Sequence, residues 1–403
     1  MYQLYCLVYQ KITKLGMYLL PWKMPEMIKG EGSIRKLPAL ISKNNFHQIL
    51  IVTGPKINAL HLLDPLRQGL DQEKINYVIF DDLSSNPTDE HVEKGVTLYK
   101  QHQCEAIIAF GGGAVMDCAK AIGACIARPK KTIHQIQGLF KVLKPIPILY
   151  AVPTTSGTGS ETTIAAVIVD SKTQHKAPIN DIVLMPKYCI LDPLLTVGLS
   201  SKITAMTGMD ALCHAIEAYT NHTYNTKLEN KLCLEAVKMI HEHLYLAYKD
   251  GNNIESREAL QEAAFYAGRA FTRGCVGYVH AIGHGLSGLY DIHHGEVMGI
   301  LLPHVLRAYG PAVYPHLAKL CDVCNLSTEN QSIQEKAESF IKWIEDLKVK
   351  MNIPKYPTFH KEDIDQIVRW AHQEANPLYP TPVTWNEKAL KSFLLDIYRG
   401  SRK

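Results

Sequence analysis

The stretch AIIAFGGGAVMDCAKAI, residues 106–122, contains the pattern that decides the fold. An apolar run typical of a buried strand leads through three glycines at 111–113 into a segment whose apolar residues recur at helical spacing. A strand that turns through glycines into a helix leaves backbone amides free at the positive end of the helix dipole, where a phosphate group can bind. The stretch matches neither G-x-G-x-x-G nor a Walker loop, so a tight turn that binds nothing is the alternative.

Short apolar runs alternate with helical patterns on the amino-terminal side of this stretch. The runs ILIVTG (49–54) and NYVIFDD (76–82) are typical of strands, whereas 57–70 and 89–102 have helical patterns. This order predicts right-handed crossovers and a mainly parallel sheet that binds its ligand at the carboxyl ends of the strands. We therefore expect an α/β, Rossmann-like dinucleotide-binding domain over residues 23–198.

The β-branched runs become rare after this domain, and long segments with helical periodicity replace them. ENKLCLEAVKMIHEHLYLAY, residues 229–248, is the clearest case. We expect residues 199–403 to form a second, all-α domain, with a shared ligand lying between the two domains. Residues 1–22 are aromatic-rich and apolar, but two lysines interrupt them and no small-residue cleavage site follows, so we interpret them as an amino-terminal extension.

A second polar loop follows another apolar run. AVPTTSGTGSE, residues 151–161, groups Thr154, Thr155 and Thr158 around two glycines. Hydroxyl groups and free amides in such a loop can hold phosphate or ribose oxygens. A connector rich in serine and threonine is the alternative for this loop alone, but two such loops at strand ends of one sheet favour nucleotide binding.

Acidic and imidazole side chains recur at helical spacing in the second half. Asp210 and His214 lie four residues apart, so a helix places them on one face, and His280 and His284 repeat this spacing. His294 lies beside a glycine in a turn before a further helical pattern. One carboxylate and three imidazoles suit Fe²⁺ or Zn²⁺ at a catalytic site, whereas buried histidines bonded to carbonyls are the alternative. The other candidates in these segments are expected to have supporting or structural roles: Glu217, His293 and His304.

Composition excludes several classes of partner. The net charge of +4 comes from charges spread along the chain without a block of one sign, so we expect no nucleic-acid partner. No apolar run reaches the roughly 18–20 residues that span a bilayer, so we expect a soluble protein without a membrane partner. The ten scattered cysteines favour a reducing compartment, the cytoplasm.

Six passages together resemble the iron-containing alcohol dehydrogenase family, which has the fold of dehydroquinate synthase. The resemblance covers residues 25–377. In chain order, the passages are NPT (86–88), GGGAVMDCAKAI (111–122), PTTSGTGSE (153–161), GMDALCHAIEAY (208–219), VHAIGHGLSG (279–288) and HGEVMGILLPH (294–304).

The resemblance implies roles for individual residues and an assembly. Its metal ligands fall on Asp210, His214, His280 and His294, and its catalytic histidine falls on His284. Its contacts to the nicotinamide cofactor fall on Asn86, Gly111, Gly112, Gly113, Asp117, Thr154, Thr155, Thr158 and Lys176. Because members of the family are usually dimers or larger assemblies, we expect a homo-oligomer.

Two departures from the family pattern affect the sites. Ala114 replaces the usual serine after the glycines, which removes one hydrogen bond to a phosphate without closing the turn. Met298 replaces a common asparagine after His294, which puts the packing on the substrate side in doubt.

A third departure concerns the choice between NADP and NAD. Gly54 follows a strand at the place where NAD-using members usually have an aspartate, and Lys56 lies two residues further on. Loss of the carboxylate removes repulsion of a 2′-phosphate, and a lysine can pair with that phosphate, so NADPH is expected to be accepted and preferred. Alternatively Gly54 only serves a turn, and Asp81 or Asp82 holds the ribose of NAD.

These observations predict hydride transfer between a small primary alcohol or aldehyde and NAD(P), with a metal acting as Lewis acid and His284 as proton relay. An enzyme like glycerol dehydrogenase, or a lyase like dehydroquinate synthase, is the runner-up. The polyanionic substrate of that lyase requires clustered cations, and the metal-site segments offer only Arg273 near a ligand. A nucleotide-binding protein that has lost catalysis is the third alternative.

Overall fold

The structure is a computed structural model that describes residues 2–84, 86–173, 176–221, 223–290 and 292–402. The chain forms two compact units. One is Pro21–Gly198, and the other joins the segment ending at Leu20 to the chain from Leu199 onward.

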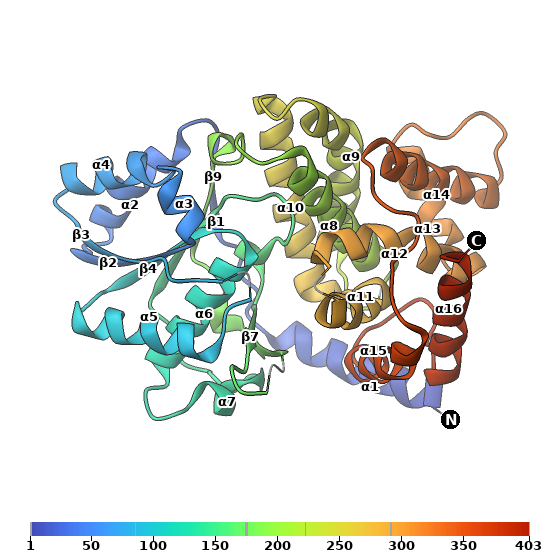
Figure 1. Ribbon diagram of the computed structural model, residues 1–403, viewed down its shortest axis with the longest axis horizontal. Coiled ribbons are helices and arrows are strands. Elements are labelled where there is room, and N and C mark those ends of the chain that lie inside the picture. Colours follow the sequence, from blue (N-terminus) through green and yellow to red (C-terminus); the bar gives the residue numbers. More distant parts are fainter. Residues whose placement is uncertain (1, 85, 174–175, 222, 291, 403) are drawn as a thin grey trace. The chain divides into compact units, whose positions relative to one another are not determined.

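A six-stranded sheet forms the centre of the first unit (Figure 1), and every described pair of neighbouring strands in it is parallel. The order across the sheet is β1-β9-β6-β4-β2-β3. The strands are β1 (Glu26–Lys29), β2 (Gln48–Thr53), β3 (Asn76–Phe80), β4 (Ala106–Gly111), β6 (Ile148–Pro153) and β9 (Tyr188–Leu191). The predicted α/β class with a parallel sheet is confirmed.

Alternation along the strands builds an apolar core on each face of this sheet. Leu50 and Val52 of β2 belong to one core, whereas Ile49 and Ile51 belong to the other. Figure 1 shows helices α5 (Asp89–Gln101) and α6 (Gly113–Ala127) covering one face, with α2 (Leu37–Lys43) and α4 (Asp64–Gln72) on the other. Because both faces are covered, the central strand β4 is apolar and buried along its whole length, whereas the edge strand β1 has exposed charged residues at both ends.

Local structure departs from the sequence pattern in two places. The pattern over 57–70 is interrupted, giving helices α3 (Pro55–Ala59) and α4, because His61 between them has a left-handed backbone with φ 57°. A separate small sheet, which the sequence analysis did not predict, has the order β5-β8-β7. Its elements are β5 (Gly138–Leu139), β7 (Ala165–Val169) and β8 (Lys176–Asn180), and helix α7 (Ile133–Ile136) precedes it.

The second unit is helical in its described part and has one large apolar core. Its helices from residue 199 onward are α8 (Ser201–Thr220), α9 (Lys227–Lys249), α10 (Ile254–Gly274), α11 (Tyr278–Tyr290), α12 (His294–Tyr309), α13 (Tyr314–Val323), α14 (Ile333–Lys350), α15 (Ile364–Ala375) and α16 (Glu387–Gly400). Short 3₁₀ helices in the two units cover Ser33–Lys36, Ser160–Thr162, Ile182–Leu184, Pro193–Leu195, Gly310–Ala312 and Lys361–Asp363. Among the described helices, none combines the length and apolar character needed to cross a bilayer.

The amino-terminal segment is a helix, α1 (Tyr2–Leu19), that packs on the helical unit. The Cys6 side chain is fully buried. The Gln10 amide nitrogen donates to the carbonyl oxygens of Pro377 and Tyr379 at 3.1 and 3.0 Å. The extension seen in the sequence is therefore an ordered part of this unit.

Candidate active site

Helix α8 provides the first two candidate metal ligands. It begins after Ser200, whose hydroxyl accepts a hydrogen bond from the Ile203 amide at 3.3 Å, and its second half is almost wholly buried. Asp210 and His214 lie on one face of this helix, with His214 Nε2 4.0 Å from Asp210 Oδ1. Spacing along one helix thus brings an imidazole to a buried carboxylate.

Helices α11 and α12 bring two further imidazoles to the same oxygen. His280 Nε2 lies 3.6 Å and His294 Nε2 3.4 Å from Asp210 Oδ1. His294 is the first residue of α12, and Gly295 lets this helix end approach α8, because a Cβ at residue 295 would overlap the carbonyl oxygen of Met206. Asp210, His280 and His294 therefore converge, with ligand atoms within 4.8 Å of one another, and His214 lies beside this group, 4.0 Å from Asp210 Oδ1.

The donor atoms at this point fit a metal ion. Asp210 Oδ1 and His280 Nε2 are buried and have no hydrogen-bond partner in the described part of the chain. An unpaired buried carboxylate oxygen is costly, so this pair indicates a cation that is bound in the working protein. Ligand atoms about 2.1 Å from one tetrahedral ion are about 3.4 Å from each other, close to the distances between Asp210 Oδ1 and the imidazole nitrogens.

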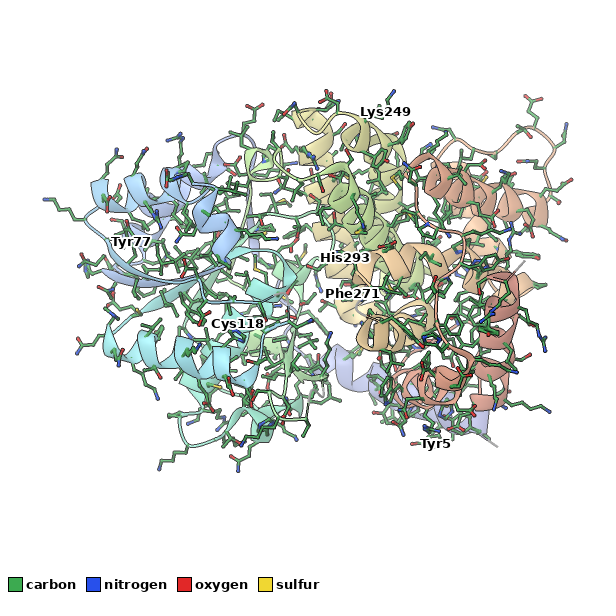
Figure 2. The ribbon with its side chains drawn as sticks, in the orientation of Figure 1. Tyr5, Tyr77, Cys118, Lys249, Phe271 and His293 are labelled. Atoms are coloured by element: carbon green, nitrogen blue, oxygen red, sulfur yellow. The ribbon has the colours of Figure 1, made fainter. Side chains whose placement is uncertain are left out.

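Aromatic stacking fixes the imidazole planes. The ring of His214 lies between Phe271 and His280, with centroids 4.1 and 4.5 Å away, and is nearly parallel to both. Figure 2 labels Phe271, which belongs to α10, and His293, which precedes the first residue of α12. The candidate ligands are therefore oriented by packing as well as by the helices that carry them.

Glu217, one turn beyond His214, binds the ring nitrogen of His280 that does not face Asp210. Its Oε2 accepts a hydrogen bond from His280 Nδ1, and its Oε1 accepts one from the Val279 amide at 2.8 Å. Burial would lower the pKa of His280, but Glu217 and Asp210 raise that pKa to about 9. A carboxylate on Nδ1 fixes the tautomer that leaves Nε2 directed at Asp210, as is common for histidines that bind metals.

Burial and histidines act in opposite directions on Asp210. Burial would raise the pKa of its carboxyl, but His214 and His294 hold that pKa well below its usual range. The side chain is therefore a carboxylate near neutral pH.

His304 lies further along α12, away from the candidate ligands. Its Nε2 donates to the carbonyl oxygen of Lys355 at 2.9 Å.

His284, the predicted catalytic histidine, lies next to the candidate ligand His294 but is not itself one of the candidate ligands. Its ring stacks on that of His294, with centroids 5.1 Å apart, and nearly half of its side chain is exposed. Its Nδ1 pairs with Glu374 Oε1 of α15 at 2.8 Å, and Tyr379 donates its hydroxyl to the same oxygen at 3.1 Å. Burial would raise the pKa of Glu374, but His284 lowers it, so the Glu374 carboxyl is ionised.

The sequence reasoning missed Glu374, because it lies ninety residues after His284 and no spacing rule connects two positions that meet only through the packing of α15 on α11. Its contact with a predicted catalytic residue could be found only in three dimensions.

In the α/β unit, the glycine turn joins β4 to α6 as predicted. Gly112 caps the helix, and the Gly111 carbonyl accepts a hydrogen bond from the Thr154 amide at 3.1 Å. A Cβ on Gly113 would lie 2.9 Å from a methyl carbon of Thr158, and one on Gly112 would lie 3.3 Å from the Thr155 hydroxyl oxygen. The glycines are therefore needed because the two predicted phosphate-binding loops touch each other here.

The buried Lys120, which the sequence analysis overlooked, holds the second loop. Its Nζ has five oxygen acceptors, at distances from 2.6 to 3.1 Å, on Ser160, Thr163 and Ala165. Burial lowers the pKa of Lys120 to about 8, against the opposing charges of Asp117 and Glu161. An ammonium with this many partners fixes the loop from residue 154 to residue 165 against α6.

The predicted contact Asp117 is held by the same loop. Its Oδ1 accepts from the Ser160 hydroxyl at 3.1 Å and its Oδ2 from the Val167 amide at 3.2 Å. Two other predicted contacts, Asn86 and Lys176, meet directly, because Lys176 Nζ donates to Asn86 Oδ1 at 3.0 Å.

The surroundings of Gly54 bear on the alternatives for the coenzyme. A Cβ on Gly54 would meet no atom within 4 Å, so a larger side chain fits there. Asp81 accepts a hydrogen bond from the Asn58 amide at 2.7 Å, and Asp82 pairs with Lys94 at 2.6 Å. Both candidate aspartates for the ribose of NAD therefore already have protein partners.

Comparison with known proteins places these features in a family. The chain matches the model of the iron-containing alcohol dehydrogenases over residues 25–193 and the model of the carboxy-terminal region of the same family over residues 204–398. The chain belongs to the iron-containing alcohol dehydrogenase family. It is therefore an oxidoreductase that acts on alcohols, as the resemblance implied.

Relatives within this family are similar over most of their length. The NAD-dependent methanol dehydrogenase of Bacillus methanolicus is 33% identical, over 87% of this chain and 92% of the relative. The NADPH-dependent butanol dehydrogenase of Clostridium saccharobutylicum is 33% identical, over 81% of this chain and 82% of the relative. A solved structure of 1,3-propanediol oxidoreductase has a TM-score of 0.90 and 30% identity, and covers 94% of this chain and all of the solved one.

Met298, one of the departures from the family pattern, lies inside the helical unit. Its side chain is fully buried, and its sulfur and methyl group fill the space left by Gly283 of α11. In this member of the iron-containing alcohol dehydrogenases, residue 298 therefore contributes to the packing of α11 against α12.

The buried lysine gives the first prediction. Replacing Lys120 with Met removes the cation that five buried oxygens contact, so we expect the free energy of unfolding to fall by about 3 kcal/mol. Thermal and urea unfolding measure this change. The KM for the coenzyme should rise more than kcat falls, because the loop loses its anchor.

Lys94→Met provides the matched control, because Lys94 pairs with Asp82 on the surface. Surface pairs contribute little, so this variant should unfold like the wild type. Equal behaviour of the two variants would contradict an anchoring role for Lys120.

Proposed function

We propose that this enzyme transfers a hydride between a small primary alcohol or aldehyde and NADP or NAD, with Fe²⁺ or Zn²⁺ held by Asp210, His214, His280 and His294. The observation that carries the proposal is the buried Asp210 oxygen, which has three imidazole nitrogens at 3.4 to 4.0 Å and no hydrogen-bond partner in the described part of the chain. Oxygen and nitrogen donors without thiolate suit either ion.

The residues at this point have separate tasks in the reaction. When bound, the metal polarises the alcohol oxygen and lowers its pKa, and the nicotinamide accepts the hydride. Asp210 supplies the negative charge that retains a divalent cation. Glu217 orients His280, and Phe271 keeps the His214 ring in its plane.

His284 is the residue that moves the proton. It contacts His294 by stacking and is nearly half exposed, so it has access both to the ligand group and to solvent. Glu374 on its Nδ1 fixes the tautomer that leaves Nε2 available and stabilises the imidazolium that forms when His284 accepts a proton.

The coenzyme is proposed to bind the α/β unit through its pyrophosphate. Gly112 and Gly113 begin α6, where the first amides of a helix have no acceptor within the helix and the helix dipole favours an anion, and the Thr155 and Thr158 side chains lie next to them. We propose that Gly54 and Lys56 accommodate a 2′-phosphate, so that NADPH is preferred. The relatives named above include an NAD-dependent and an NADPH-dependent enzyme, so the family allows either coenzyme.

The lyase alternative has little support among the described side chains. Arg273 is buried, its Nε donates to the carbonyl oxygen of Tyr224 at 3.0 Å, and its guanidinium lies over the Tyr18 ring. Because the Arg273 guanidinium already has these protein contacts, it is not available to bind a polyanionic substrate. Net oxidation of NADPH or NADH in the presence of an aldehyde separates the reductase from the lyase, which returns its hydride.

We also propose a cytoplasmic location and a homo-oligomer. All ten cysteines are free in the structure, which fits a reducing compartment. The assembly rests on the family resemblance alone.

A pair of histidines on α12 tests the metal ligands. His294→Ala should reduce the metal content after reconstitution at least tenfold and abolish turnover, because it removes one direct ligand. His304→Ala is the matched control, since His304 lies on the same helix, where it donates to the Lys355 carbonyl oxygen and stacks on Tyr356. Metal analysis of both variants makes the comparison, and full metal retention in His294→Ala would refute the assignment.

His284→Ala separates proton transfer from metal binding. The variant should keep its metal while kcat falls by about 10²-fold, the loss typical of a missing positioned acid or base. Added imidazole should restore part of the rate, because it can enter the space of the lost ring. A loss of metal as large as in His294→Ala would instead make His284 a ligand.

Gly54→Asp tests the coenzyme preference. The open space at Gly54 admits the carboxylate, which should repel the 2′-phosphate and bind a ribose hydroxyl. We expect kcat/KM to favour NADPH in the wild type and to shift at least tenfold toward NADH in the variant. A wild type that prefers NADH, with no further shift in the variant, would contradict the proposal.

A further inference from the structure

Helix α1 has an outer face of large apolar side chains that are mostly exposed, although the Arg273 guanidinium lies over the Tyr18 ring at one end. Eight large apolar side chains of this helix are each about half or more exposed, up to 82% for Leu19. They are Leu4, Tyr5, Leu7, Val8, Ile12, Leu15, Tyr18 and Leu19. Figure 2 labels Tyr5 among them.

These eight residues lie on one side of the helix, and the exposed Lys11 lies among them. At about 100° per residue, they fall within an arc of about 160°. Cys6 and Gln10, which bind the helix to the unit beneath, lie on the opposite side. The exposed residues are therefore the outer half of a helix that is already docked by its inner half.

The face is larger than a monomer normally exposes. At roughly 100 Å² of exposed surface for each of the eight side chains, it presents on the order of 800 Å², whereas the largest apolar patch of a typical monomer is roughly 300–600 Å². Its size therefore indicates a surface that is covered in the working protein.

The charges of this segment are all positive. Lys11 and Lys14 are the only charged residues of α1, Lys23 follows with Trp22 before it, and the first acidic residue of the chain is Glu26. Long lysine side chains can extend their ammonium groups to a polar layer while their stems stay on apolar surface. Tyrosine and tryptophan are the residues that favour the boundary between lipid and water.

We propose that α1 binds the surface of an anionic phospholipid bilayer, with its apolar face in the outer acyl layer and its lysines at the lipid phosphates. Pairing of α1 with α1 of a second copy would bring like charges together, whereas an anionic bilayer complements both the apolar face and the lysines. The helix lies on the membrane without spanning it. This proposal departs from our expectation of no membrane partner, which considered only spanning segments.

The proposed surface is a feature of this chain rather than of the family core. The family model begins to match at residue 25, after the end of α1 at Leu19. Membrane binding is therefore independent of the proposed function, and either can fail without the other.

Vesicle sedimentation tests the proposal with the metal-loaded enzyme of residues 1–403. We expect it to bind vesicles of equimolar phosphatidylcholine and phosphatidylglycerol at least tenfold more strongly than phosphatidylcholine alone, and high salt should weaken the binding. The double variant Ile12→Glu and Leu15→Glu should lose binding by at least tenfold. Val349→Glu is the matched control, since Val349 is similarly exposed on α14 but lies outside this face, and it should bind like the wild type.

A second double variant, Lys11→Gln and Lys14→Gln, keeps the apolar face and should lose the preference for anionic vesicles. Turnover without vesicles should match the wild type in all these variants, which shows that they are folded. Equal binding of the wild type and the Ile12→Glu, Leu15→Glu variant would overturn the proposal. A second result would also overturn the proposal. In it, the wild type does not bind vesicles, and light scattering shows a wild-type dimer that dissociates in the Ile12→Glu, Leu15→Glu variant. The apolar face would then join two copies of the chain.

Discussion

A buried carboxylate with no hydrogen bond on one oxygen is the constraint on which the helical unit depends. Asp210 lies in the interior of α8, and its Oδ1 faces the imidazoles of His214, His280 and His294 instead of a backbone donor. Histidines keep this carboxyl ionised despite burial, and a divalent cation would satisfy all four groups at once. Bringing the imidazoles to this carboxylate also requires Gly295 and Glu217. Gly295 lets α12 approach α8, and Glu217 holds His280 in place.

The α/β unit meets a different requirement, the close approach of two loops at the ends of β4 and β6. Glycines at 112 and 113 make room for the hydroxyl side chains of Thr155 and Thr158. Lys120 then holds the far end of the second loop through a network of buried oxygens. Small residues and one buried cation thus shape the polar loops that follow β4 and β6.

Short-range patterns in the sequence predicted much of this arrangement, because they depend on geometry that repeats every two or every 3.6 residues. The strands at 49–54 and 76–82 and the paired positions of Asp210 with His214 are of this kind. Glu374 and Lys120 could not be predicted, because their partners lie 90 and about 40 residues away and meet them only after folding. The apolar pattern over residues 57–70 also did not indicate the left-handed backbone at His61. The structure therefore has two helices, α3 and α4, where the sequence predicted one.

The most direct test of the account is X-ray absorption spectroscopy of the enzyme reconstituted with Fe²⁺ or Zn²⁺. A site built from Asp210 and three histidines predicts a nearest shell of nitrogen and oxygen only, at about 2.0–2.2 Å, with the outer-shell scattering of several imidazole rings. A sulfur shell at about 2.3 Å, or a spectrum without imidazole scattering, would contradict the assignment of these four ligands.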